Sequence, residues 1–269
     1  MINAREMVLK EKILGMKDLP TLTGNIIELI KAVTSDDVDM QEVIRLVKKD
    51  PVLVTKMMKM VNSSLYALPV RIDSVEMIVT FLGATKVKSI IMTASVMDTI
   101  NNADQELWNH SHMTSVLMAQ IIEKEHIPVA PGFLITALVH DIGQIVLNIF
   151  NAKGVKMAQK LSEKEMIPIH EAEKKVIGVD HAIVGAWLLE LWELDESFIL
   201  PVAYHHNHEE VSEKYLKETA LLQFADYIEE KSRNNECYQV PIQLLELAGL
   251  EYLDVEYWTE EYEKLSSKI

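Results

Sequence analysis

The stretch Ala137-Leu138-Val139-His140-Asp141-Ile142-Gly143 places an imidazole and a carboxylate side by side at the end of an apolar run. Two such polar groups are costly in a protein core unless hydrogen bonds or a metal ion satisfy them. Neighbouring side chains on a helix lie about 100° apart, so one of the pair can bind a metal terminally while the other bridges to a second. The interpretation of the chain depends on whether other segments supply further ligands.

An upstream helix offers two candidate ligands. Glu106 and His110 are four residues apart, so their side chains lie on one face of the expected helix. Leu117 and Ile121 continue that face, and we therefore expect both Glu106 and His110 to point toward the core.

Three downstream segments supply four more candidates. They are His181, which starts an apolar helix face, His205 and His206, which follow an apolar segment, and Asp226, which lies in mid-helix among apolar residues. The remaining histidines have no special neighbours, and we expect them to be surface or satisfied residues: His112, His126, His170 and His208.

Composition and periodicity favour an almost all-α protein. The 269 residues are 49% hydrophobic and 25% charged, with only nine Gly and eight Pro, and the apolar residues recur at helical spacing. Asp39 and Asp50-Pro51 are helix start signals. We expect a short-helix bundle over residues 1–101 and a second helical bundle, carrying the candidate ligands, over residues 102–269. Helices of that second bundle are predicted at 103–125, 145–149, 152–165, 169–177, 180–192, 196–204, 218–233, 240–250 and 254–266.

Charge and cysteine content restrict the class of function. The net charge of −15 is unevenly spread: residues 1–100 carry 13 Lys/Arg and 12 Asp/Glu, whereas residues 101–269 carry 13 and 29. This balance argues against nucleic-acid binding through phosphate contacts. Cys237 is the single cysteine, which fits a reducing compartment, and no apolar run approaches the roughly 20 residues of a membrane helix. We expect a cytoplasmic protein without a membrane partner.

If the five histidines and three carboxylates converge in the core, something must compensate for their burial. Imidazole and carboxylate together suit iron, manganese, zinc or nickel, and no thiolate is present to favour zinc or copper. Three carboxylates also suit two bridged divalent ions. The alternative is a vestigial cluster, in which the histidines bond to one another inside a protein-interaction scaffold.

The order of these residues resembles the HD superfamily of metal-dependent phosphohydrolases, and most closely the HDOD domain, a signalling relative of the HD-GYP phosphodiesterases. The resemblance covers nearly the whole chain. It is carried in the first bundle by Leu19-Pro20-Thr21-Leu22, Asp50-Pro51-Val52-Leu53 and Val61-Asn62-Ser63-Ser64-Leu65-Tyr66, continues from Ile72-Asp73-Ser74-Val75 to Phe81-Leu82-Gly83, and returns at Trp108-Asn109-His110-Ser111 and Tyr204-His205-His206.

The resemblance implies a complete ligand set: Glu106, His110, His140, Asp141, His181, His205, His206 and Asp226. It implies two divalent ions, with iron as the analogous metal and manganese, nickel or zinc as alternatives. Two departures argue against catalysis. Gln144 replaces the lysine that contacts phosphate in active relatives, and Asn207-His208-Glu209-Glu210 follows His206 where a Gly-Tyr-Pro segment would be expected.

Two functions from different classes remain open. The first is a metal-binding HDOD signal-transduction domain without robust catalysis, which acts on a protein partner or senses metal or redox state. The second is a metal-dependent phosphohydrolase or phosphodiesterase, in which two ions activate water for attack on a nucleotide or cyclic dinucleotide.

Overall fold

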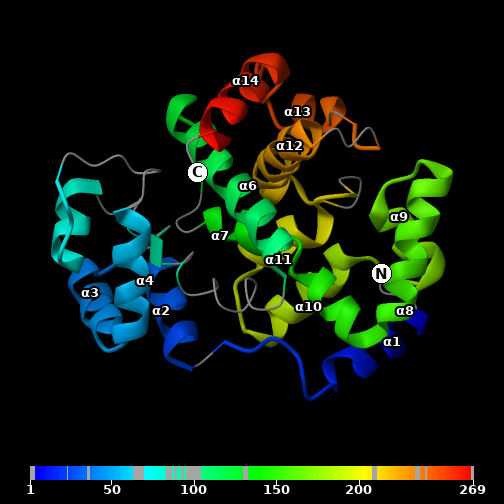
Figure 1. The fold of residues 1–269 in the computed structure, drawn as a ribbon, viewed down its shortest axis with the longest axis horizontal. Helices are drawn as coiled ribbons and strands as arrows, with labels where there is room; N and C mark the ends of the chain where they lie inside the picture. Colours follow the sequence, from blue (N-terminus) through cyan, green and yellow to red (C-terminus); the bar gives the residue numbers. More distant parts are fainter. Residues whose placement is uncertain are drawn as a thin grey trace.

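A computed structural model shows that the chain is all-α, as predicted (Figure 1). It describes residues 4–22, 24–34, 37–62, 70–82, 87, 90–91, 94, 104–129, 133–207, 211–233, 237–239 and 241–267. The first helices are α1 (Ala4–Leu14), α2 (Gly24–Thr34), α3 (Met40–Lys48) and α4 (Pro51–Val61), followed by a helix over 75–82. The others are α6 (Gln105–Lys124), α7 (Leu134–Val139), α8 (Ile142–Glu165), α9 (Ile169–Val176), α10 (His181–Leu191), α11 (Glu196–Tyr204), the 3₁₀ turn η2 (Glu213–Tyr215), α12 (Leu216–Ser232), α13 (Ile242–Leu247) and α14 (Val255–Ser266).

Several parts of the expected pattern fall outside the described residues. These are residues 63–66, Gly83, His208 and most of residues 84–101, the last part of the first expected bundle. Within that last segment the described residues are Val87, Ile90, Ile91 and Ala94, and all four are fully buried. Their burial fits the helical bundle expected over residues 1–101.

Aspartates begin many of these helices. The side chains of Asp39 and Asp50 accept hydrogen bonds from backbone N–H groups in the first turns of α3 and α4, as the sequence predicted. Asp104, Asp180 and Asp254 do the same for α6, α10 and α14. An N-cap acceptor satisfies an N–H that the helix cannot pair by itself, so each helix start is encoded within a few residues.

The Asp50 cap gives a direct test of this local coding. Its Oδ1 accepts hydrogen bonds from the N–H groups of Val52 and Leu53, both at 3.0 Å. We expect Asp50→Ala to lower the free energy of unfolding by about 1 kcal/mol, because both donors lose their side-chain acceptor. Urea denaturation measures the loss. Val52→Ala is the control, because the Val52 side chain is 62% exposed, and an equal loss in both variants would contradict the capping role.

Helix α8 is a single helix with a kink where two helices were expected. Asn151 has non-helical backbone angles (φ −153°, ψ 65°), at the break predicted between 149 and 152. Its side-chain Oδ1 accepts the N–H of Gly154 at 3.0 Å, so Asn151 works as an internal cap for the second half. The kink changes the direction of the second half of α8, which packs against α9.

The buried side chains form two apolar clusters. One joins α2, α3 and α4 to α8, α10 and α11, and the other joins α6 to α12, α13 and α14. The first cluster crosses the expected boundary at residue 101, and the division into 1–101 and 102–269 stays a prediction. In Figure 1, α2–α4 lie on one side of the molecule, and α7 and α11 lie near its centre.

Helix α1 packs against α10. Lys10 pairs with Glu190 and lies over the ring of Trp187, 5.9 Å from its centroid. The linker that follows is held where the indole N–H of Trp192 donates to the carbonyl oxygen of Pro20 at 3.1 Å. The N-terminal segment is therefore part of this domain's own packing.

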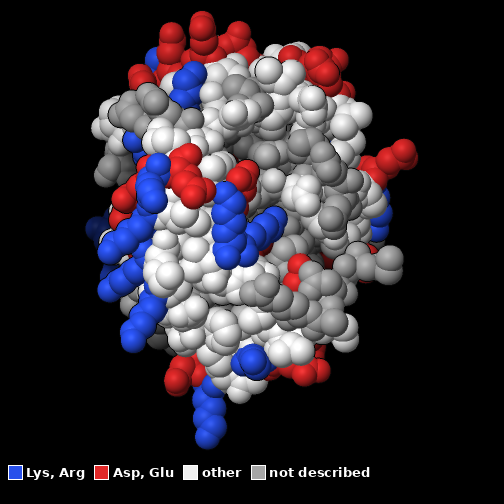
Figure 2. Space-filling view, turned by 90° about the vertical axis from the view of Figure 1, so that its right-hand side faces the viewer, with Lys and Arg blue, Asp and Glu red and all other residues white. Residues whose placement is uncertain are grey.

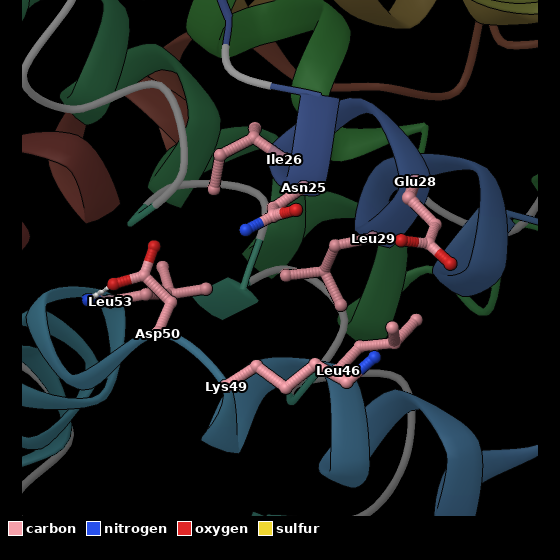
Figure 3. Close-up of a pocket in the computed structure, with 8 residues that line it drawn as sticks. All are labelled: Asn25, Ile26, Glu28, Leu29, Leu46, Lys49, Asp50 and Leu53. Carbon is pink, nitrogen blue, oxygen red and sulfur yellow. Dashed lines mark hydrogen bonds between the residues drawn. The ribbon is translucent and has the colours of Figure 1, made fainter.

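A small pocket lies among α2, α3 and α4 (Figure 3). Asn25, Leu29 and Leu53 are among its lining residues, and its volume is about 20 Å³. A space of this size holds roughly one water molecule, so it is too small for an organic ligand.

One helical stretch, Leu134–Glu165, is long and apolar enough to cross a membrane by length and composition. However, 67% of its apolar window is buried inside the fold, and it contains the α7–α8 junction and the kink at Asn151. Core helices of soluble proteins share these properties, so the stretch is weak evidence for a membrane span.

Candidate metal centre

The α7–α8 junction places His140 and Asp141 at the middle of the site. His140 is fully buried and Asp141 is 6% exposed. The next turn contains Gly143, where an added Cβ would lie 1.9 Å from the carbonyl oxygen of His181. Only glycine permits so close an approach of α8 to α10, and this approach brings His181 beside Asp141.

Four side chains form the first cluster: His110, His140, Asp141 and Asp226. The Nε2 atoms of His110 and His140 are 3.1 Å apart. The same atoms lie 3.2 and 3.5 Å from Asp226 Oδ1, and 3.5 and 3.6 Å from Asp141 Oδ2. Two ligands bound to one ion at about 2.1 Å lie roughly 3.0–3.4 Å apart at octahedral or tetrahedral angles, so these spacings are close to those of a shared ion.

The second cluster contains His181, His205, His206 and, again, Asp141. His181 Nε2 lies 2.9 Å from His206 Nε2 and 3.0 Å from Asp141 Oδ1. His205 Nε2 is 3.6 Å from the same Oδ1, and it is buried without a hydrogen-bond partner among the described residues. A buried nitrogen without a hydrogen-bond partner suits the role of a metal ligand, because a bound ion would take up its lone pair.

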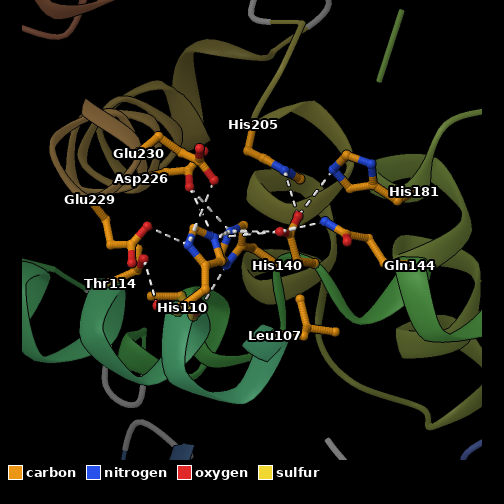
Figure 4. A network of polar contacts seen from close by, with 12 residues as sticks. Leu107, His110, Thr114, His140, Gln144, His181, His205, Asp226, Glu229 and Glu230 are labelled. Atoms are coloured by element: carbon orange, nitrogen blue, oxygen red, sulfur yellow. Dashed lines mark hydrogen bonds and ion pairs between the residues drawn. The ribbon is translucent and has the colours of Figure 1, made fainter. Parts of the chain in front are cut away.

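Asp141 faces both clusters. Its Oδ1 lies toward His181 and His205, and its Oδ2 lies toward His110 and His140. Figure 4 shows the resulting line of polar groups, with Asp226 and His110 at one end and His181 and His205 at the other. One carboxylate between two groups of imidazoles is the arrangement expected of a bridging ligand.

A further ring of acceptors orients the imidazoles. The Nδ1 atom of His110 is 2.6 Å from Glu229 Oε2, and that of His181 is 2.6 Å from Glu173 Oε2. The Nδ1 atoms of His140 and His205 lie 2.7 and 2.6 Å from the backbone oxygens of Ala137 and Val202. Each Nδ1–H therefore donates outward and each Nε2 points inward, which is how metal-binding histidines are held.

Sequence reasoning missed these outer carboxylates. Glu229 follows Asp226 by three residues on α12, and this i,i+3 spacing was a usable signal. Glu230 lies 3.8 Å from His110 Nδ1 and joins His110 and Asp226 in a third possible ligand group. Glu173 precedes His181 by eight residues across a turn, and no local pattern links the two.

The electrostatics of the site favour positive charge. Burial opposes protonation of His110, but hydrogen bonds with Asp226 and Glu229 outweigh it and raise the pKa of His110 well above its usual value. Burial likewise opposes protonation of His181, while Glu173 and Asp141 raise its pKa. Burial would raise the pKa of Asp141, yet His140 and His181 hold it well below the usual range. Asp141 is thus ionised and attracts cations.

Glu106 does not join the site. Its side chain is exposed in the first turn of α6, so the expectation that it points toward the core is wrong. Leu107 and Trp108 are the buried residues of that turn, and Figure 4 shows Leu107 on the site side of α6 near His110. The physical reason is the phase of the helix. Residues four apart are offset by roughly 40° around the helix axis, whereas the buried face of α6 continues from His110 to Leu107, three residues earlier.

Two of the histidines that were expected to have no special neighbours do have specific ones. The His170 ring stacks on His206 with centroids 4.1 Å apart, and its Nδ1 is buried without a hydrogen-bond partner in the part of the chain that the structure describes. Burial, followed by the charge of His181, lowers the pKa of His170 to about 3. His112 stacks on Trp108 at 5.3 Å. The expectation that these two have no special neighbours is wrong, whereas His126 is exposed, as expected.

The outer ring can be tested through Glu173. We expect Glu173→Gln to weaken metal binding by the second cluster roughly ten- to hundred-fold, because His181 loses the anionic acceptor that orients it. Competition with a chromophoric chelator measures the affinity. Glu171→Gln is the control, because Glu171 is an exposed carboxylate on the same helix. Equal affinities for the two variants would show that Glu173 does not support the site.

Comparisons with known proteins identify the family of this chain. The family model of the HDOD domain matches residues 19–208. An uncharacterised protein of Treponema pallidum (strain Nichols) is 26% identical over 217 residues, a match that covers 78% of this chain and 42% of that protein. The chain thus spans less than half the length of this relative.

Two solved structures share the fold. An HDOD domain protein of unknown function from Geobacter sulfurreducens has a TM-score of 0.81 and 23% identity, over 97% of this chain and 94% of its own. A candidate phosphohydrolase from Shewanella amazonensis SB2B has a TM-score of 0.74 and 17% identity, over 97% and 94%. Because the family model matches most of the sequence and these structures share its helical architecture, the chain belongs to the HDOD family.

Proposed function

We propose that this chain is a metal-binding signal-transduction domain that holds two divalent ions and has no robust catalysis of its own. The observation that carries the proposal is the 3.1 Å separation of the Nε2 atoms of His110 and His140. Each ring donates its Nδ1–H to an oxygen. When both rings are neutral, each Nε2 atom therefore carries a lone pair and no hydrogen. Two lone pairs at this distance repel unless a proton or a metal ion lies between them, and the carboxylates of Asp141 and Asp226, within 3.6 Å of the two nitrogens, favour the metal ion.

The donor atoms support two ions. Asp141 offers one oxygen to each cluster, and the two clusters otherwise use separate histidines. The donors are imidazole nitrogens and carboxylate oxygens with no thiolate, a set that suits iron, manganese, nickel or zinc, and we propose iron. Such ions would supply charge neutralisation, and a redox-active pair would also change charge on oxidation. A change of that kind could be transmitted through α8, α10 and α12 to a signalling protein partner.

Gln144 supports a role without robust turnover. Its side-chain amide donates to Asp141 Oδ2 at 2.7 Å, so it orients the central carboxylate. An amide has no positive charge to stabilise the transition state of phosphoryl transfer, and a lysine would supply that charge. The residue therefore serves the metal site as a positioning group.

Metal analysis tests the proposal. Protein purified without chelator or affinity resin should contain about two ions per chain, and anomalous scattering at the iron, nickel and zinc edges should name them. Treatment with a chelator should lower the thermal unfolding temperature, because an ion that binds only the folded state stabilises it. Protein without stoichiometric metal, together with a His140→Ala variant of unchanged stability, would remove the metal centre.

The alternative function is a metal-dependent phosphohydrolase that acts on nucleotides or cyclic dinucleotides. It is favoured by the position of Asp141 between two histidine clusters, which is typical of two-metal hydrolases. A structure of similar fold is also described as a candidate phosphohydrolase. Hydrolysis of nucleotides or cyclic dinucleotides with Fe²⁺ or Mn²⁺, abolished in Asp141→Ala, would establish this function in place of the first.

A further inference from the structure

A cleft of about 420 Å³ opens beside the metal site, inside the bend of α8 and against α9. Its apolar wall is formed by Ile145, Ile149, Val155 and Ile169. Its polar lining residues are Asp104, Gln144, Asn148, Lys156, Gln159 and Glu173. The kink at Asn151 lies between the two parts of α8 that line the cleft, so it lets one helix form two of its walls. The volume is that of a small-molecule site.

The polar groups of the cleft differ in their availability. One oxygen of each carboxylate is already engaged, because Asp104 Oδ1 caps α6 and Glu173 Oε2 accepts both the N–H and the Nδ1–H of His181. The side chains of Asn148, Lys156 and Gln159 are exposed, and no hydrogen bond or ion pair joins them to other described residues. The available groups are therefore a cation and two amides.

The surface around the cleft carries positively charged side chains, which favour a negatively charged ligand. Figure 2 looks onto the side of the molecule that carries α8 and α9, where Lys and Arg side chains gather although this half of the chain is strongly acidic. The exposed lysines of these helices are Lys153, Lys156, Lys160, Lys164, Lys174 and Lys175. Lys174 and Lys175 pair with Asp180 and Glu165, whereas Lys156 lines the cleft without such a partner.

We propose that this cleft binds a small organic anion, with its charged group on Lys156 and its apolar part on the isoleucine wall. The inference rests on the proposed function, because bound metal ions add positive charge on the inner side of the cleft. The bound anion would be the signal that the domain senses. Two lining residues, Gln144 and Glu173, hold Asp141 and His181 by hydrogen bonds. A ligand in the cleft therefore contacts the supports of both metal clusters, and its binding is linked to metal binding.

Calorimetric titration of the full chain with three probes tests the site. Phenylphosphonate, which cannot be hydrolysed at a P–O ester bond, and benzoate represent the two sources of negative charge, and benzyl alcohol is the neutral analogue. Metal-loaded protein should bind one or both anions in preference to the alcohol. Lys156→Met should weaken that binding roughly ten- to hundred-fold, the effect of losing a hydrogen bond to a charged group. Lys160→Met, on the same exposed helix, is the matched control.

The outcomes separate this inference from the proposed function. Metal content is measured on the same samples, so metal-loaded protein that binds neither anion would overturn the cleft site and leave the metal-binding function intact. Equal affinity in Lys156→Met and in wild type would also overturn it. Slower loss of metal to a chelator when the anion is present, in wild type but not in Lys156→Met, would support the link to the metal clusters.

Discussion

Replacement of Asp141 by alanine is expected to reduce bound metal from about two ions per chain to almost none. Its Oδ1 is 3.0 Å from His181 Nε2 and its Oδ2 is 3.5 Å from His110 Nε2, so one substitution removes a ligand from both clusters. The loss also removes negative charge from a site whose cations must be balanced. Elemental analysis of the purified variant measures the effect.

Single-cluster variants make this result specific. His110→Ala should lose the ion of the first cluster and His206→Ala that of the second, because each histidine belongs to one side of Asp141 only. The matched carboxylate control is Glu106→Gln, which should keep both ions because Glu106 is exposed outside the clusters. Retention of two ions in Asp141→Ala, or their loss in Glu106→Gln, would contradict the assignment of ligands.

Gly143→Ala is expected to lower the free energy of unfolding by about 3 kcal/mol or more, at the upper end of the cost of overpacking a core. The new Cβ would lie 1.9 Å from the carbonyl oxygen of His181 and 2.6 Å from the backbone nitrogen of Gly185. Backbone atoms cannot rotate away, so α8 and α10 must separate. Because Asp141 and His181 belong to the two elements that move apart, the variant should also bind metal more weakly. Urea denaturation and elemental analysis measure the two effects.

Two other glycines provide controls for this interface. An added Cβ at Gly185, on the facing side of the same contact, has its nearest neighbour at 3.4 Å, which is ordinary van der Waals distance. At Gly24 no atom lies within 4 Å. Alanine at either position should change stability by about 1 kcal/mol or less, since it also favours the helix. A Gly143→Ala variant as stable as these controls would show that the close approach of α8 and α10 is not required.

Several features of the fold could be predicted from the sequence because their signals are local. The caps at Asp39 and Asp50 act within three residues, and helix 196–204 has the predicted bounds. The break between 149 and 152 was also predicted, although it is a kink in one helix and not a gap between two. In each case the determining hydrogen bonds join residues that are neighbours along the chain.

The candidate site was predictable only in part. The order of histidines and aspartates, and the resemblance that it carries, named seven side chains that the structure brings together. Helical spacing was not sufficient to decide the direction of Glu106, because the phase of α6 is set by what the helix packs against. The partners Glu173 and Glu229 were also missed, since their contacts cross 8 and 119 residues of chain.

The helical class, the main helix starts and the chemistry of the His140-Asp141 pair follow from the sequence, because these depend on short-range capping, periodicity and residue type. Tertiary structure alone decided which oxygen of Asp141 faces which histidines, which carboxylates orient those histidines, and where a cleft opens beside them. Those features depend on the close packing of α8 against α10, which Gly143 permits, and on the kink in α8. They arise where distant segments meet, and no short stretch of sequence encodes such a meeting.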